Sequence, residues 1–301
     1  HENTAATFAQ VFYGFNIGNI PVDGVIGGRQ VHTWGTAFSM DRVNVDGVAT
    51  MVPRYTNMDY TDFIPSAHAV VHFTPKLQWR VAYSKNVQRP NFDQATSFTF
   101  LDNPANGIAT GWGGNAELQA NIEENYDTSL EYYFGPGGVV SFAAYLKTPD
   151  GFIYDEQRPE TIDGVEYLIS RPRNASPGTF QGYEFNAQGF FDFLPGKLAN
   201  LGAQFNYSYN QVAKIDYPGD DDNAIGNSKY TYNAILYYDT PKFSARIAYN
   251  YRDRYRAWAV REAFADYSPY VEATSRLDAA INWTPIKQMT RWDLRRIRNP
   301  N

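Results

Sequence analysis

The sequence predicts an all-β protein: an antiparallel transmembrane β-barrel with roughly eleven or twelve strands. Three observations support this. Apolar and polar residues alternate in segments of about ten residues. Short turns alternate with long polar stretches, and aromatic residues make up 16% of the chain. Because successive side chains of a strand point to opposite faces, strict alternation is typical of strands, and helical periodicity is not sustained anywhere.

The hairpin over residues 126–147 shows the pattern most clearly. Tyr126, Leu130 and Phe134 share one face of its first strand, and polar residues such as Asp127 and Glu131 occupy the other. Residues 135–138 form a Gly- and Pro-rich turn, and the return strand alternates again. A two-stranded hairpin is not stable alone in water, so we expect neighbouring strands on both sides.

The same alternation recurs along the chain, in residues 69–73, 77–84, 183–188, 201–210, 243–252 and 277–283. One face of these strands is aliphatic in the middle and aromatic toward the ends, as at Phe73, Phe134, Tyr249, Tyr251 and Trp283. Aromatic rings favour the membrane–water boundary, whereas charged groups facing lipid cost a few kcal/mol each. We therefore expect the apolar face to contact lipid and the polar face to line a wet lumen.

Connections of two lengths alternate between the predicted strands. Short turns carrying Pro or Gly are predicted at residues 19–24, 74–76, 135–138, 194–197, 239–242 and 284–287. Long polar loops are predicted at residues 35–60, 90–120, 149–177, 212–228 and 253–269. Outer-membrane barrels show this arrangement, with short periplasmic turns and long extracellular loops.

Composition narrows the function classes. The 301 residues carry a net charge of -6, which does not favour binding to nucleic acid, and there is no cysteine to build a disulfide framework. No run approaches the eighteen or so apolar residues of a membrane helix. No catalytic triad order, zinc-protease motif, phosphate loop or dinucleotide fingerprint is present, so we expect no enzyme, no catalytic residue and no cofactor.

Several stretches resemble the barrel of TonB-dependent outer-membrane receptors. They include YTDFIPS at residues 60–66, LQWRVAYS at 77–84, RPNF at 89–92, ENYDTSLEYYF at 124–134, PRNA at 172–175, GYE at 182–184 and FDFLPG at 191–196. Their order and spacing together carry the resemblance, which covers most of residues 8–284. The most similar subgroup is often associated with uptake of carbohydrates or plant polymers.

The resemblance implies active import of a small-molecule ligand, a carbohydrate or a siderophore, across the outer membrane of a Gram-negative bacterium. In the family a plug sits inside a barrel of about twenty-two strands, and the TonB complex supplies energy. This chain has about half those strands and shows no plug and no TonB box. We therefore expect residues 1–288 to be a truncated C-terminal portion of such a barrel. Residues 289–301, which do not alternate, form an atypical tail outside it.

Three arginines are candidate ligand-binding residues. Arg252, Arg254 and Arg256 alternate at the end of a predicted strand and could project to one side. Together with Trp258 and Arg261 they could bind an anionic or sugar ligand through forked hydrogen bonds and ring stacking. The alternative is a lumen charge network, in which the arginines pair with Asp127, Glu131, Glu184 and Asp278.

Four aromatic residues in predicted outer loops are further candidates: Trp112, Tyr154, Tyr167 and Tyr217. Their rings suit stacking against sugars, but aromatic residues in long loops also pack loops together. The sequence leaves both readings open.

No metal site is expected. His68 and His72 are four residues apart, which on a strand separates them by roughly 13 Å, so we expect them to face lumen or solvent. Asp220, Asp221 and Asp222 lie in a predicted loop without a spaced ligand set, and a solvated acidic loop explains them.

Two other functions remain open. A passive porin-like barrel would use the same strands and differ only in lacking a plug. A soluble β-sandwich that binds sugars would bury the apolar face against a second sheet.

Overall fold

The computed structural model describes residues 1–45, 48–102, 109–135, 137–175, 177–212, 226–257 and 269–284. Most of this part of the chain forms one antiparallel sheet of eleven strands, in which each strand pairs with the next along the sheet. This confirms the predicted all-β fold and strand number. The strands are β1 (Glu2–Ile17), β2 (Ile20–Val45), β3 (Val48–His72), β4 (Leu77–Gln88), β7 (Asn121–Phe134), β8 (Gly138–Asp150), β11 (Phe180–Phe190), β12 (Leu201–Val212), β13 (Tyr230–Asp239), β14 (Phe243–Arg252) and β17 (Thr274–Trp283).

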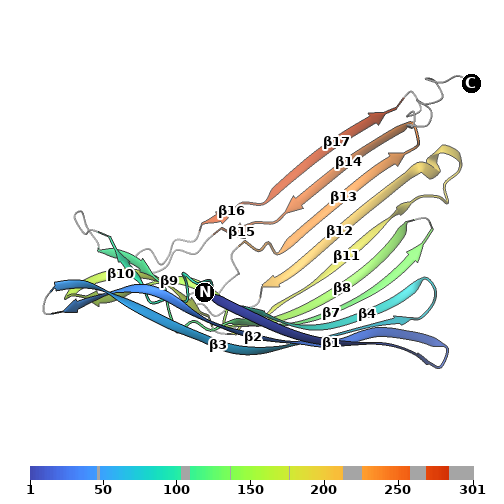
Figure 1. The fold of residues 1–301 in the computed structure, drawn as a ribbon. Coiled ribbons are helices and arrows are strands. Elements are labelled where there is room, and N and C mark those ends of the chain that lie inside the picture. Colours follow the sequence, from blue (N-terminus) through green and yellow to red (C-terminus); the bar gives the residue numbers. More distant parts are fainter. Residues whose placement is uncertain are drawn as a thin grey trace, which may run out of the picture.

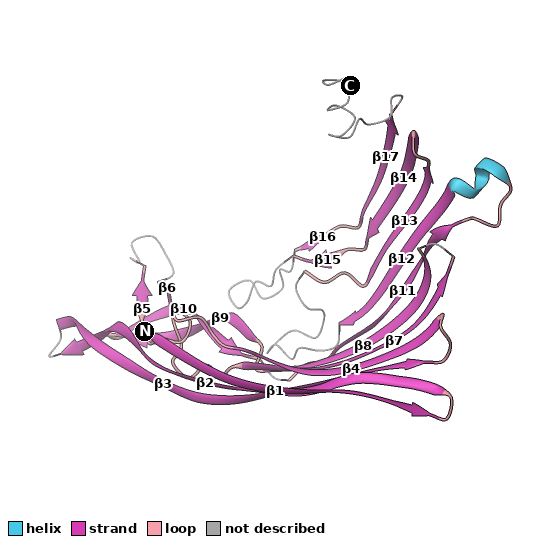
Figure 2. Cartoon of the chain, turned by 45° about the vertical axis from the view of Figure 1, so that its right-hand side comes forward, coloured by secondary structure: helices cyan, strands magenta, loops and turns pink. Residues whose placement is uncertain are grey.

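The sheet is open and curved. Strands β1 and β17 are its two edges, and the strands between them bend into a trough (Figures 1 and 2). The barrel is therefore partial, as predicted. No helix in the described residues is long and apolar enough to cross a membrane.

Short connections gather at one end of the strands and long ones at the other, except that β2 and β3 follow each other closely at the end with the long connections (Figure 1). The predicted turns at residues 74–76, 135–138, 194–197 and 239–242 fall at connections between neighbouring strands, with Gly138 and Asp239 already in β8 and β13. The turn predicted at residues 19–24 is wrong by a few residues. The chain reverses at Gly18 and Asn19, because Gly18 adopts φ +61, and residues 20–24 already belong to β2.

The long loop predicted at residues 35–60 is also wrong, because this stretch continues the hairpin of β2 and β3. The two strands stay paired from Gly35 opposite Met58 to Val45 opposite Val48. Outside a membrane a strand needs no apolar face, so the polar composition of this stretch is compatible with pairing. With 26 residues, β2 extends over roughly 85 Å, far more than a bilayer core of about 30 Å, so the hairpin projects well beyond the other strands.

Three other predicted loops contain strands of their own. Strands β5 (Thr99–Leu101), β6 (Thr110–Gly113), β10 (Val165–Asn174) and β9 (Ile153–Ile162) form a four-stranded sheet, called here the loop sheet. Strands β15 (Tyr255–Arg256) and β16 (Tyr270–Val271) form a small separate pair. The loop sheet holds a small apolar core, in which Ala109, Tyr167 and Ile169 are buried.

Arg171 holds the loop sheet together. Its Nε and Nη2 donate to the two carboxylate oxygens of Glu160, at 2.8 and 2.9 Å. Nη1 donates to the carbonyl oxygens of Phe98 and Gly114, and Nη2 also donates to the Thr99 hydroxyl. One guanidinium therefore joins two predicted loops that lie 57 to 73 residues apart in the sequence.

Strand pairing sorts the main sheet into two chemically distinct faces. On the outer face, cross-strand partners form an apolar row from Trp79 through Leu130, Phe142 and Phe185 to Tyr207. On the inner face, the neighbouring row is polar and consists of Gln78, Glu131, Ser141, Asn186, Asn206, Asn233 and Asn250. The large outer side chains remain open to the surroundings, with Leu130 46% and Phe142 50% exposed.

Candidate ligand-binding site

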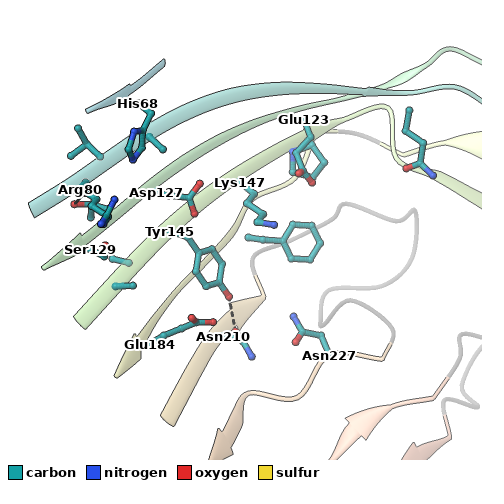
Figure 3. Close-up of a pocket in the computed structure, with 18 of the residues that line it drawn as sticks. His68, Arg80, Glu123, Asp127, Ser129, Tyr145, Lys147, Glu184, Asn210 and Asn227 are labelled. Atoms are coloured by element: carbon teal, nitrogen blue, oxygen red, sulfur yellow. Dashed lines mark hydrogen bonds between the residues drawn. The ribbon is translucent and has the colours of Figure 1, made fainter. Parts of the chain in front are cut away.

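A cavity of about 830 Å³ lies against the inner face of the sheet, and is called here the inner cavity. Its polar side chains come from neighbouring strands and point to the same side of the sheet (Figure 3). This follows from strand geometry, because residues two apart share a face. The charged and amide side chains that line it include Arg80 of β4, Glu123 and Asp127 of β7, Lys147 of β8, Glu184 of β11, and Asn210 of β12.

Tyr145 of β8 reaches across β11 to Asn210 of β12. Its hydroxyl donates to Asn210 Oδ1 at 2.6 Å, as Figure 3 shows. The residue between them is Gly182, which pairs with Tyr145 on one side and Asn210 on the other. A Cβ atom at Gly182 would lie 2.6 Å from the Tyr145 hydroxyl oxygen and also press on the Tyr209 carbonyl. Glycine is therefore required for this crossing.

The inner cavity is acidic. Its three carboxylates are Glu123, Asp127 and Glu184, and none of them forms an ion pair with another described residue. Arg80 is already neutralised, because its Nε lies 3.1 Å from Glu131 Oε2. Besides Arg80 and His68, the described lining contains one basic residue, Lys147.

A second cavity of about 430 Å³ adjoins the first and is called here the basic cavity. Lys229, Arg254 and Arg256 line it, and Asn210 and Asn227 line both cavities. Arg256 is buried, at 4% exposure. A hydrogen bond with Tyr230 and the surrounding charges raise the pKa of Lys229, so this residue stays cationic.

Aromatic rings surround the cations of the basic cavity. Lys229 Nζ lies 5.8 Å from the ring centroid of Tyr209 and 5.3 Å from that of Tyr230. Arg254 Cζ lies 5.6 Å from the ring centroid of Tyr270. Among the described lining residues the one carboxylate belongs to Asp253, which accepts a hydrogen bond from the Arg254 backbone at 2.9 Å.

The structure separates the three arginines that the sequence grouped. Strand β14 ends at Arg252, so the three residues do not continue along one strand. Arg252 donates to the Ser228 hydroxyl and the Gly226 carbonyl, and its guanidinium lies over the Tyr255 ring. These contacts fix Tyr255, which lines the basic cavity. Arg254 and Arg256 line the cavity itself.

Two of the four acids of the alternative charge network have other partners. Glu131 pairs with Arg80, and Asp278 pairs with Arg276 at 2.9 Å. Trp258 and Arg261, which the sequence added to the arginine group, lie outside the described residues.

The candidate aromatic residues do not form one platform. Trp112 is half exposed, stacks on Phe100 at 4.9 Å between ring centroids and meets Phe98 edge-on. Tyr167 is buried in the loop sheet, and Tyr154 packs around Ala175 with Phe152 and Phe180. Tyr154 and Tyr167 therefore pack loops, while Trp112 keeps an accessible ring. Tyr217 lies outside the described residues.

The two histidines lie apart on β3. His68 lines the inner cavity, and His72 Nε2 lies 2.5 Å from Asp23 Oδ2. Within the described ranges, no group of three His, Cys, Asp or Glu residues could hold a metal ion. Asp220, Asp221 and Asp222 lie outside those ranges.

Sequence reasoning missed Tyr145, Lys147, Asn210 and Lys229 as cavity residues. The signal for the first three was present in the alternation, since each occupies a polar-face position of its strand. Their convergence was not visible, because it depends on which residues stand opposite one another in neighbouring strands.

Solved structures with a similar fold include receptors for siderophores and their ferric complexes. The siderophore receptor PirA from Acinetobacter baumannii matches with TM-score 0.61 and 13% identity, over 95% of this chain and 49% of that chain. A mutant of the ferric enterobactin receptor PfeA from Pseudomonas aeruginosa, in complex with enterobactin, matches with TM-score 0.61 and 14% identity over 95% and 47%. The ferric-catecholate import receptor Fiu from E. coli matches with TM-score 0.62 and 13% identity over 95% and 39%.

These similarities establish the fold. The chain spans about half the length of the first of these receptors. A search of curated protein sequences finds no match. The family model for the TonB-dependent receptor-like β-barrel matches residues 1–299. This family comprises receptors and transporters of the Gram-negative outer membrane rather than enzymes, and the match favours it over the porin and sandwich alternatives. The chain therefore belongs to the TonB-dependent receptor family, as part of its β-barrel.

Proposed function

We propose that this chain supplies part of the barrel wall of an outer-membrane receptor that imports a small-molecule ligand with energy from the TonB complex. Residues 1–288 contribute to that wall. The observation that carries the proposal is the inner cavity, which lies on the polar face of a curved sheet whose opposite face is apolar. A ligand would bind in this cavity before it is imported.

The outer face supports placement in lipid. Its row of Trp79, Leu130, Phe142, Phe185 and Tyr207 is continuous across five strands. Exposed apolar surface of this extent is unfavourable in water but favourable against acyl chains. The inner polar row would be costly in lipid and is stable along a wet lumen.

Energy dependence tests the proposal against a passive pore. The complete gene product would be expressed in two Gram-negative strains that differ only in the gene for TonB, and uptake of radiolabelled candidate ligands would be followed. We expect accumulation against a gradient only in the strain with TonB. Equal uptake in both strains, or conductance of the purified protein in a planar bilayer, would instead favour a passive porin.

A further inference from the structure

We propose that the inner and basic cavities form one site for an acidic sugar, a hydroxyl-rich ligand that carries a carboxylate. The carboxylate lies in the basic cavity and the hydroxyl groups lie in the inner cavity. This inference rests on the proposed function and narrows the ligand from the broad choice between a carbohydrate and a siderophore.

The basic cavity fits a carboxylate. Lys229 and Arg254 line it together with Arg256, and among the described residues of its lining Asp253 supplies the one carboxylate. A guanidinium can bind a carboxylate with two parallel hydrogen bonds. The rings of Tyr209 and Tyr270, which lie beside Lys229 and Arg254, offer flat surfaces for the apolar face of a sugar ring.

The inner cavity fits hydroxyl groups. Glu123, Asp127 and Glu184 offer carboxylate oxygens, which accept hydrogen bonds from hydroxyl donors. Lys147 donates from the same wall. With about 830 Å³, the cavity lies within the usual volume range of ligand sites.

The same carboxylates disfavour a compact polyanion. A ferric tris-catecholate complex carries several negative charges, and it would meet three carboxylates against one unpaired lysine. Each like-charge contact would oppose binding, because a cavity in the protein screens charges less than bulk water does. The charge arrangement therefore favours a ligand whose negative charge is confined to one end.

Asn210 connects the two halves of the site. It lines both cavities, and its amide is fixed from two sides. Tyr145 donates to its Oδ1 at 2.6 Å, and its Nδ2 donates to the Ser228 carbonyl at 3.0 Å. A ligand that spans the cavities passes this fixed amide, so the two halves have a defined spacing.

Binding of three probes to the purified complete receptor, measured by isothermal titration calorimetry, tests the inference. The probes are an oligogalacturonate, its neutral methyl ester and a ferric tris-catecholate. We expect the oligogalacturonate to bind at least about tenfold more tightly than its ester and the ferric complex not to bind. Equal binding of acid and ester, no binding of the acid, or tighter binding of the ferric complex would overturn the inference.

Variants inside and outside the basic cavity test whether the carboxylate of the ligand binds there. Lys229→Gln with Arg254→Gln should weaken binding of the acid about tenfold or more and leave binding of the ester nearly unchanged. Arg276→Gln, which removes an exposed cation paired with Asp278 outside both cavities, is the control and should change neither. Loss of acid binding in the control alone would contradict the assignment. TonB-dependent uptake of the ferric complex would refute the ligand class while leaving the receptor function intact.

Discussion

The guanidinium of Arg89 lies over the ring of Tyr60, with Arg89 Cζ 3.2 Å from the ring centroid. Arg89 also forms an ion pair with Asp62, which stands two residues from Tyr60 on β3. Arg89 directly follows β4. The two separate stretches that carried the family resemblance, one before β4 and one after it, therefore meet in a single contact.

Replacing Arg89 with leucine should destabilise the sheet. The change removes the ring contact and leaves the partly buried Asp62 carboxylate, 20% exposed, without its cation. We expect a loss of about 1–3 kcal/mol, measured as a lower unfolding temperature in detergent. Arg276→Leu is the control, because the Arg276 side chain is 78% exposed and contributes little. Equal effects of the two changes would contradict this role for Arg89.

The two faces of β8 should respond oppositely to charge. Phe142 belongs to the outer apolar row and Ser141 to the inner polar row, where it stands opposite Glu131. Phe142→Arg should destabilise the folded protein in lipid vesicles by about 2–4 kcal/mol, whereas Ser141→Arg should be nearly neutral. Urea titration followed by tryptophan fluorescence measures both. A larger loss from Ser141→Arg would reverse the assignment of the faces.

Removing the Arg171 guanidinium should loosen the loop sheet without unfolding the main sheet. Both Arg171→Ala and Arg171→Lys lose the paired hydrogen bonds to Glu160, because a single ammonium cannot reproduce a planar fork. We expect faster proteolytic cleavage within residues 90–120 or 153–174, detected by mass spectrometry. Arg276→Ala is the control, since the Arg276 side chain is 78% exposed and lies on β17, outside the loop sheet, and it should leave the cleavage pattern unchanged.

Alanine at Gly182 should weaken ligand binding by moving Tyr145. The added Cβ would lie 2.6 Å from the Tyr145 hydroxyl oxygen, so the hydrogen bond to Asn210 would be displaced. Affinity for every ligand of the inner cavity should fall several-fold, as titration calorimetry would show. Tyr145→Phe keeps the ring and removes only the hydroxyl, so it should reproduce most of the loss. Unchanged affinity in both variants would exclude a role for this contact.

Alternation in the sequence was enough to predict most strands of the main sheet, their two faces and most of the short turns. Trp79, Leu130 and Phe142 could be assigned to one face before their neighbours were known, because every second residue shares a face. Tertiary contacts could not be predicted in this way. Arg171 contacts the Gly114 carbonyl across 57 residues, and no local pattern indicates that partner.

Residues 35–60 were wrongly predicted to be a loop because they are polar. Polarity argues against a strand only where one face of the strand must be apolar. Beyond a membrane that condition no longer applies, because antiparallel strands can pair while they face water. The cavity residues were missed for a related reason. Tyr145, Gly182 and Asn210 meet only when three strands are placed in register.

The continuous pairing of β2 and β3 out to Val45 and Val48 restricts how this outer arm can change during evolution. An irregular loop accepts one extra residue anywhere, but a paired ribbon does not, because a single insertion in either strand inverts the orientation of every side chain beyond it. Length changes in this arm should therefore occur as matched additions to both strands or at its tip. The arm would thus grow and shrink in steps, while its exposed side chains vary freely.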